Sequence, residues 1–161
     1  MRHAKAEPFA STDHARVLIE RGRADSADAG SYLAGIAAVP DHAVVSTSAR
    51  TRETWTLIAE AAGADVEATF DDAVYHGGTD EALESLRAVP DDATTVIFVG
   101  HNPTASNLVH LLDDGKGDPD AVSGMLRGFP TSALVVFDVS GSWADLGVES
   151  ARVTAFHAPS R

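Results

Sequence analysis

Short apolar runs alternate with stretches of helical periodicity along most of the chain. The clearest strand pattern is Thr94–Val99, a continuous run rich in β-branched residues that indicates burial on both faces, as in a parallel sheet. Ala43–Val45 is a shorter strand-like run. Apolar residues at helical spacing predict four helices: Ala24–Ala38, Arg50–Ala62 (ended by Gly63), Glu81–Ala88, and a stretch that buries Ala105, Leu108, Val109 and Leu112.

The pattern changes toward the end of the chain. Ala133–Val139 and Arg152–Phe156 predict two strands with no helix between them. Asp113–Ser123, rich in Gly, Pro and Asp, predicts a mobile loop. The complete order predicts an α/β protein: a three-layer α/β/α sandwich whose central sheet is mostly parallel, with one antiparallel strand late in the chain. We expect residues 1–161 to form a single domain.

Charge and composition exclude several classes of partner and chemistry. Twenty-four acidic against twelve basic residues give a net charge of −12, so we expect neither a nucleic-acid partner nor an anionic membrane surface. The sequence has no cysteine, which excludes disulfides, thiolate zinc sites and a cysteine nucleophile. The apolar runs are too short to span a bilayer and no signal-peptide pattern opens the sequence, so we expect a soluble, cytoplasmic protein.

Basic residues follow the strand-like runs. Arg50 comes shortly after Ala43–Val45, and His101 follows Thr94–Val99 directly. Arg2 and His3 form a third candidate segment. Reactive residues of open α/β sheets collect where parallel strands end, so these groups are expected to share one crevice. Cations gathered in this way need an anion, which indicates a phosphate or carboxylate site.

Four segments, in order along almost the whole chain, carry a family resemblance: Arg2-His3-Ala4-Lys5, Asp13-His14-Ala15-Arg16, Ser46 through Thr54, and Val99-Gly100-His101-Asn102-Pro103. Together they resemble the histidine phosphatase (phosphoglycerate mutase-like) superfamily, and in particular its phosphohistidine phosphatase, SixA-like branch. Two of the seven histidines lie at the matched catalytic positions. We expect the other five to be surface or packing residues: His14, His42, His76, His110 and His157.

The resemblance implies a mechanism without metal or cofactor. His3 would be the nucleophile and would become a phosphohistidine. A clamp of cationic and polar groups would hold the phosphoryl oxygens. Its members would be Arg2, Arg50 and His101, with Arg16 and Asn102 as further substrate contacts.

The resemblance leaves more than one candidate for the general acid and for the substrate. Asp72 is the candidate acid by position, with Asp13 and Glu81 as rivals. We expect the substrate to be a phosphohistidine on a protein partner. The alternatives are a small phosphorylated metabolite, or an inactive member that only binds phosphorylated ligands; a mutase is a weaker option. Ser46–Ser48 are interpreted as a helix cap rather than as a serine nucleophile, because no Gly-x-Ser-x-Gly elbow surrounds them.

The start of the sequence departs from the family pattern. The family's nucleophile follows a central parallel strand, whereas only Met1 and Arg2 precede His3 here. A central strand that was lacking would leave two neighbouring ladders unpaired. We therefore expect the first strand to be truncated in this sequence and the natural protein to carry residues before Met1.

Overall fold

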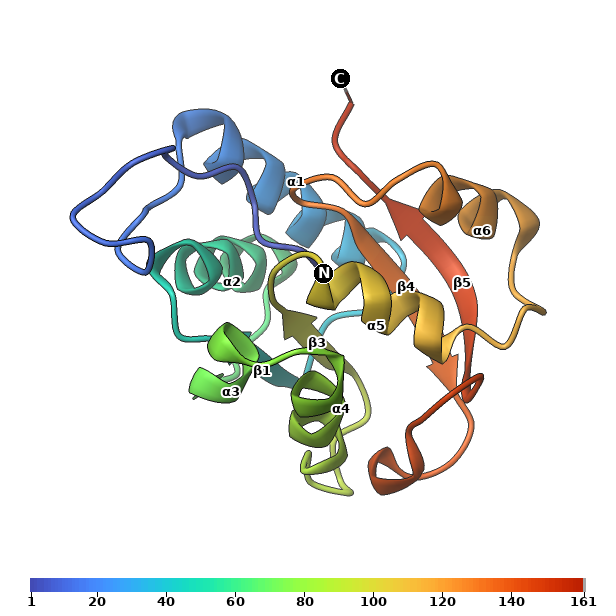
Figure 1. Cartoon of the computed structure of the whole chain (residues 1–161). Helices are drawn as coiled ribbons and strands as arrows, with labels where there is room; N and C mark the ends of the chain where they lie inside the picture. Colours follow the sequence, from blue (N-terminus) through green and yellow to red (C-terminus); the bar gives the residue numbers. More distant parts are fainter. Residues whose placement is uncertain (161) are drawn as a thin grey trace.

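The computed structural model describes residues 1–160 and contains two small sheets (Figure 1). Three parallel strands pair in the order β2–β1–β3, with bounds Ala68–Asp71 for β2, His42–Ser46 for β1 and Val96–Val99 for β3. The other two strands, β4 (Leu134–Val139) and β5 (Ala151–His157), pair antiparallel. The mixed α/β architecture with a parallel sheet and an antiparallel pair late in the chain confirms the predicted fold class.

Residues 1–3 lie between the two sheets as a short piece of strand. The Met1 amino group donates to the Phe98 carbonyl (2.7 Å), Gly100 N–H to the Met1 carbonyl (3.1 Å), and His3 N–H to the Gly100 carbonyl (2.9 Å). This alternation is that of a parallel ladder. On the other side, Arg2 N–H donates to the Ala133 carbonyl (3.0 Å). The start of the chain therefore continues the sheet beyond β3.

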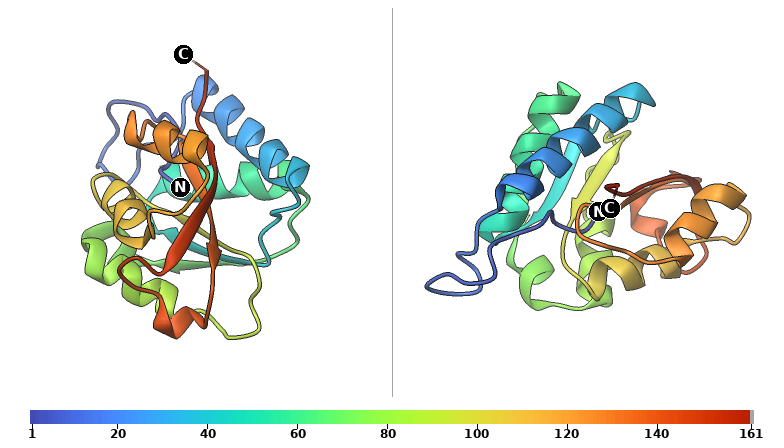
Figure 2. Two further views of the ribbon diagram at one scale, coloured as in Figure 1. Left: turned by 90° about the vertical axis from the view of Figure 1, so that its right-hand side faces the viewer. Right: turned by 90° about the horizontal axis from the view of Figure 1, so that it is seen from above.

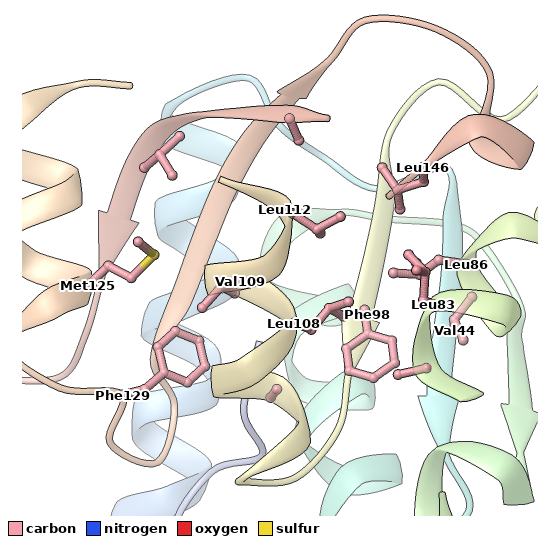
Figure 3. Packing of buried hydrophobic residues seen from close by; sticks show 14 of the residues in the cluster. Val44, Leu83, Leu86, Phe98, Leu108, Val109, Leu112, Met125, Phe129 and Leu146 are labelled. Carbon is pink, nitrogen blue, oxygen red and sulfur yellow. The ribbon is translucent and has the colours of Figure 1, made fainter. Parts of the chain in front are cut away.

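Side chains of β1 and β3 alternate between two helical layers. Ala43 and Val45 face α1 (Glu20–Gly35) and α2 (Ala49–Ala62), together with Trp55 and Ile58. Val44 and Phe98 face the opposite layer, which contains Leu86 and Leu108 (Figure 3). The helices on that side are α3 (Asp72–His76), α4 (Thr79–Arg87), α5 (Thr104–Leu112) and α6 (Pro119–Leu126). Burial on both faces explains why these strands are continuous apolar runs. Among residues 1–160, no helix has the length and apolar character needed to cross a membrane.

Three details of the sequence prediction are wrong. The first helix begins at Glu20, four residues before its predicted start. The predicted loop Asp113–Ser123 holds the beginning of α6, because the Asp118 carboxylate caps it by accepting from two backbone N–H groups and Pro119 occupies its first turn. The five-residue helix α3 was not predicted, since it is too short for a helical period to show. A 3₁₀ turn over Trp143–Asp145 precedes β5.

Gly22 in α1 lies against the backbone of Lys5, just after the Arg2–His3 segment. A Cβ at this position would lie 2.0 Å from the Lys5 carbonyl oxygen. The same carbonyl accepts a hydrogen bond from Ile19 N–H (3.0 Å). The absent side chain thus lets the first turn of α1 pack directly on the backbone that leads away from His3.

We predict that Gly22→Ala destabilises the protein by roughly 1–3 kcal/mol, because the methyl group forces the Lys5 backbone away from α1. The matched control is Gly35→Ala at the end of the same helix, where a Cβ meets nothing within 4 Å. That change is expected to be neutral or slightly stabilising, since alanine favours the helix. Urea unfolding of both variants measures the difference, and equal stability of the two would contradict this account of Gly22.

Candidate active site

His3 is held rigidly at the meeting point of three strand ends. Its backbone N–H donates to Gly100, and its carbonyl accepts from Ser132 N–H (3.1 Å). The next residue is anchored by α2, because Ala4 N–H donates to the Thr54 hydroxyl (3.0 Å). The imidazole is buried, with 8% of His3 exposed. Hence the ring has little freedom to leave the site.

The tautomer of His3 follows from its hydrogen bond. Nδ1 lies 2.7 Å from the carbonyl oxygen of Ala4, and a carbonyl can only accept. Nδ1 therefore carries the proton in the neutral ring. The lone pair then belongs to Nε2, which is the atom available for nucleophilic attack.

Arg50, in the first turn of α2, is 5% exposed and contacts two segments of the site. Its Nη1 donates to the Asp13 carbonyl (2.8 Å) and its Nη2 to the Asp13 carboxylate (3.0 Å). Nη2 also lies 3.3 Å from His101 Nδ1. A guanidinium only donates, so Nδ1 of His101 is the acceptor here.

His101 follows β3, and its ring centre lies 5.2 Å from that of His3. Because Nδ1 accepts from Arg50, Nε2 carries the ring proton and donates to the Ser46 hydroxyl at 2.7 Å. Ser46 is fully buried at the end of β1. The ends of the two neighbouring strands β1 and β3 thus bring Ser46 and His101 together.

Arg2 and Arg16 add two positive charges near His3. Together with the charge of Arg50, they contribute to lowering the pKa of the His3 imidazole. Arg2 Nη1 donates to the Phe129 carbonyl (3.1 Å), and Arg16 Nη1 donates to the Glu7 carbonyl (3.1 Å). Arg16 Nε lies 3.0 Å from an Asp13 carboxylate oxygen, although the angle does not make a hydrogen bond.

The three arginines share an unusual feature. Each has a buried Nε atom that finds no hydrogen-bond partner among residues 1–160: Arg2, Arg16 and Arg50. Buried polar groups are almost always hydrogen-bonded, and an unsatisfied one costs on the order of 1–3 kcal/mol. The three guanidinium charges that act on one imidazole suit an anion with several oxygens.

Burial and positive charge keep both histidines neutral. Burial is the main cause that lowers the pKa of His3 to about 4, with the charges of Arg50, Arg2 and Arg16 acting in the same direction. The Ala4 carbonyl opposes this shift by accepting from the ring. For His101, burial followed by the nearby His3 and Arg50 lowers the pKa to about 3. Near pH 7 the lone pair of His3 is therefore free of a proton.

The three candidate acids have different surroundings. The Asp13 carboxylate touches Arg50 and accepts from the Tyr75 hydroxyl (2.9 Å). The Tyr75 bond, followed by the two arginine charges, lowers the pKa of Asp13 despite partial desolvation. Asp72 is exposed and accepts from the Thr47 hydroxyl (2.6 Å). Glu81 accepts from Gly78 N–H (2.7 Å) at the start of α4, which is a capping contact.

Other contacts refine the sequence interpretation. The Asn102 amide donates to the Phe129 carbonyl (3.0 Å), the same oxygen that binds Arg2. The interpretation of Ser46–Ser48 as a helix cap is confirmed in position, because Ser48 is the N-cap residue of α2, although its hydroxyl makes no cap bond to the backbone and lies 2.8 Å from the Thr51 hydroxyl. Ser46 and Tyr75 were not singled out as site residues. A serine at a strand end was the only signal for the first, and Tyr75 reaches the site through the placement of α3.

The side chains of the candidate site also determine whether it can bind a metal ion. Within residues 1–160, no group of three or more histidine, aspartate or glutamate side chains is arranged to hold a metal ion. The donors that converge on His3 are guanidinium groups, which carry positive charge and suit anions. The arrangement can therefore bind a phosphoryl group, and it offers a nitrogen lone pair beside it.

Comparisons with known sequences identify relatives of similar length. No family model matches the chain. An uncharacterized protein of Mycobacterium tuberculosis is 35% identical over 161 residues and one of Mycobacterium leprae is 32% identical over 164 residues; each alignment covers 99% of both chains. The curated relatives thus match the chain over its whole length.

Solved structures are also similar. A protein of Nakamurella multipartitia, provisionally named phosphohistidine phosphatase SixA, has a TM-score of 0.85 at 36% identity and covers 99% of this chain and 93% of that one. A protein of Agrobacterium tumefaciens with the same provisional name has a TM-score of 0.81 at 29% identity, with coverage of 99% and 95%. The protein histidine phosphatase SixA complexed with tungstate shares the fold, with a TM-score of 0.78 at 20% identity, covering 97% and 92%.

We predict that the free energy of unfolding falls as the pH is lowered from 6.5 to about 4. The folded protein keeps His3 neutral down to its lowered pKa of about 4, whereas the unfolded chain takes up a proton near pH 6.5. The unfolded state therefore binds more protons between pH 4 and 6.5. The folded protein has its full free energy of unfolding only above pH 6.5. When His3 is fully protonated, the free energy of unfolding has fallen by roughly 3 kcal/mol.

Urea unfolding between pH 4 and 7 tests this expectation. His3→Asn keeps a donor for the Ala4 carbonyl but removes the titrating ring, so its curve should be flatter in this window. His110→Gln, at an exposed position on α5, is the control and should follow the unaltered protein. Parallel curves for the unaltered protein and His3→Asn would refute the assignment.

Proposed function

Because this chain belongs to the SixA-like branch of the histidine phosphatase superfamily, we propose that it removes the phosphoryl group from a phosphohistidine of a protein, through a phosphoenzyme on His3. The observation that carries the proposal is the set of three guanidinium charges that act on a buried, neutral imidazole. The donors fit the oxygens of a phosphoryl group, and the imidazole fits the role of nucleophile.

In the first step, the lone pair of His3 Nε2 attacks phosphorus in line with the bond to the substrate nitrogen. A bond forms between Nε2 and phosphorus as the bond to the substrate imidazole breaks, and the departing nitrogen keeps that electron pair. The departing nitrogen then takes a proton from water. Nδ1 keeps its proton and goes on donating to the Ala4 carbonyl, which stabilises the positive charge that develops on the ring.

The guanidinium groups of Arg2, Arg16 and Arg50 stabilise the three phosphoryl oxygens while charge moves among them. His101 lies within 3.3 Å of Arg50 and is a further candidate contact for a phosphoryl oxygen. Its Nδ1 holds no proton while Arg50 donates to it, so a hydrogen bond from this atom to a phosphoryl oxygen requires a proton shift within the ring or protonation. The negative charge of the phosphoryl group favours that change by raising the pKa of His101.

In the second step, the oxygen of a water molecule attacks the phosphorus of phospho-His3. The bond between phosphorus and Nε2 breaks and its electrons return to Nε2, which regenerates the neutral imidazole. The products are inorganic phosphate and the free substrate histidine. The attacking water releases one proton, which neutralises the hydroxide left when the departing imidazole took its proton, so the two steps together consume one water molecule.

The surroundings of Asp13 support a phosphohistidine rather than an alkyl phosphate. Its lowered pKa leaves it ionised at neutral pH, so it has no proton to donate to a departing alkoxide. An imidazole leaves from a P–N bond with less need for an acid. Asp72, the acid expected by position, remains a candidate for reactions of phosphate esters, and its contact with the Thr47 hydroxyl keeps it near the end of β1.

The shape of the region before α1 supports a protein substrate. Residues 7–17 form a loop that projects beyond the helices and also supplies Asp13 and Arg16 to the site (Figures 1 and 2). Phe9 is 87% exposed in this loop. An exposed aromatic side chain in the loop that carries Asp13 and Arg16 offers a contact for a partner protein.

We predict that the unaltered protein, mixed with a labelled phosphoramidate in EDTA, becomes phosphorylated with a bond that is stable in alkali and labile in acid. His3→Ala should lose the label completely, because it removes the attacking nitrogen. His110→Ala should retain it. Label that persists in His3→Ala would exclude His3 as nucleophile, whereas phosphate binding without any label would favour a non-catalytic binding protein.

We also predict that Asp13→Asn binds inorganic phosphate about two- to fivefold more tightly, because it removes a carboxylate that competes for Arg50 and Arg16. Asp72→Asn, at a carboxylate bonded only to a hydroxyl among the described contacts, should bind phosphate like the unaltered protein. Calorimetric titration with phosphate provides the measurement. Weaker binding by Asp13→Asn would mean that its carboxylate organises the arginines rather than competing for them.

A further inference from the structure

A cleft of about 470 Å³ lies between helices α1 and α6. Its walls come from α1, from the end of α6 with the loop that follows it, and from residues 156 and 158–160. Figure 1 shows this last segment passing between α1 and α6. Arg16, Arg50 and His101 do not line the cleft, so it is separate from the phosphoryl site.

The cleft nevertheless begins close to the nucleophile. Lys5 lines it and follows His3 by two residues, which limits the distance between their Cα atoms to about 7 Å. The loop of residues 128–131 borders both places. The Phe129 carbonyl accepts from Arg2 Nη1 (3.1 Å), whereas the other three residues of this loop line the cleft. Residues that flank a substrate phosphohistidine therefore come within reach of the cleft.

Positive side chains predominate in the cleft, although the protein has a net charge of −12. Within residues 1–160, it is lined by three basic residues, Lys5, Arg21 and Arg127, and by one acidic residue, Asp25. All three basic residues are exposed. Together with the three arginines of the phosphoryl site, they make up six of the twelve basic residues of the chain. Half of the positive charge is thus gathered in two adjacent places.

The contacts of these side chains offset their charge only in part. Arg21 donates from Nε to Asp25 (2.7 Å) and from Nη2 to the Ser160 carbonyl (2.6 Å), which fixes the guanidinium. The Asp25 side chain is 12% exposed and that of Arg21 54%, so the arginine is the partner that faces solvent. Arg127 donates to the Ser123 hydroxyl (2.8 Å), which is a neutral group. The cleft therefore presents an excess of positive charge to an incoming anion.

Apolar groups form another part of the cleft surface. The Phe156 ring lies over Gly124, where a Cβ would come within 2.5 Å of the ring. Pro130, Ala158 and Pro159 extend this surface. A peptide can pack its backbone and side-chain methylene groups on such a surface while its charged groups pair with the cations around it.

We propose that this cleft binds an acidic segment of the partner protein, whose carboxylates lie within three residues of the phosphohistidine and pair with Lys5, Arg21 and Arg127. This rests on the proposed function, because it specifies the residues around the substrate histidine. Three residues of extended chain span about 10 Å, which exceeds the separation of His3 and Lys5. A nucleic acid is disfavoured, because its charge extends far beyond three side chains and meets a protein of net charge −12.

The test uses two peptides of about twelve residues, each with one central histidine phosphorylated by phosphoramidate. One carries Asp and Glu at the three positions on either side of this histidine, and the other carries Asn and Gln there. We expect the unaltered protein to hydrolyse the acidic peptide with a kcat/KM about five- to tenfold higher, because exposed ion pairs each contribute modestly. Lys5→Gln and Arg127→Gln should each reduce this ratio by about two- to threefold.

The matched control is Lys116→Gln, which removes the same charge outside the cleft and should keep the full ratio. Raising the salt concentration should lower the ratio in the unaltered protein, because salt screens exposed charges. Equal kcat/KM values for the two peptides would overturn the proposal, and so would an unchanged ratio in both Lys5→Gln and Arg127→Gln.

Calorimetric binding of the unphosphorylated peptides separates this proposal from the phosphatase activity. If neither phosphopeptide is hydrolysed, the proposed function fails, and binding then decides the role of the cleft. Selective binding of the acidic peptide that is lost in Arg127→Gln would support the proposal, whereas equal binding of both peptides would overturn it. Succinate that binds as tightly as the acidic peptide would also overturn it, by making the cleft a site for small anions.

Discussion

Positive charge concentrated around a buried, neutral imidazole is the constraint that organises this molecule. The charges of Arg2, Arg16 and Arg50 act on His3, and within residues 1–160 the buried Nε atom of each has no hydrogen-bond partner. Asp13 supplies the opposing carboxylate, and the Tyr75 hydroxyl holds it in place. One carboxylate offsets only part of this positive charge, which leaves the site suited to an anion with several oxygens.

The fold meets this constraint by bringing separate strand ends to one point. Ser46 ends β1, His101 follows β3, and residues 1–3 lie beside β3 as a further short strand. Helix α2 starts at the same edge and fixes both Arg50 and, through the Thr54 hydroxyl, the backbone after His3. Each side chain thus comes from a rigid element, which suits a site that must hold its geometry during phosphoryl transfer.

Most of the strands and helices around the site could be predicted from the sequence, because the signals that specify them are local. The β-branched run before His101 specifies a buried strand, and Gly63 adopts the left-handed conformation expected where α2 ends. The helical start at Asp118-Pro119 was overlooked within a polar segment. Ser46 and Tyr75 were not predicted as site residues, since their roles depend on how β3, α3 and the first loop meet in three dimensions.

The ladder that joins residues 1–3 to β3 also limits how the sequence can change. Three consecutive hydrogen bonds, from Met1 to Gly100, set the position of His3 relative to His101. Deleting or inserting one residue in either segment would turn the following side chains to the opposite face of the sheet. A change of two residues would restore the face but displace one histidine by roughly 7 Å. Substitutions can alter this edge of the protein gradually, whereas length changes there separate the two histidines in a single step.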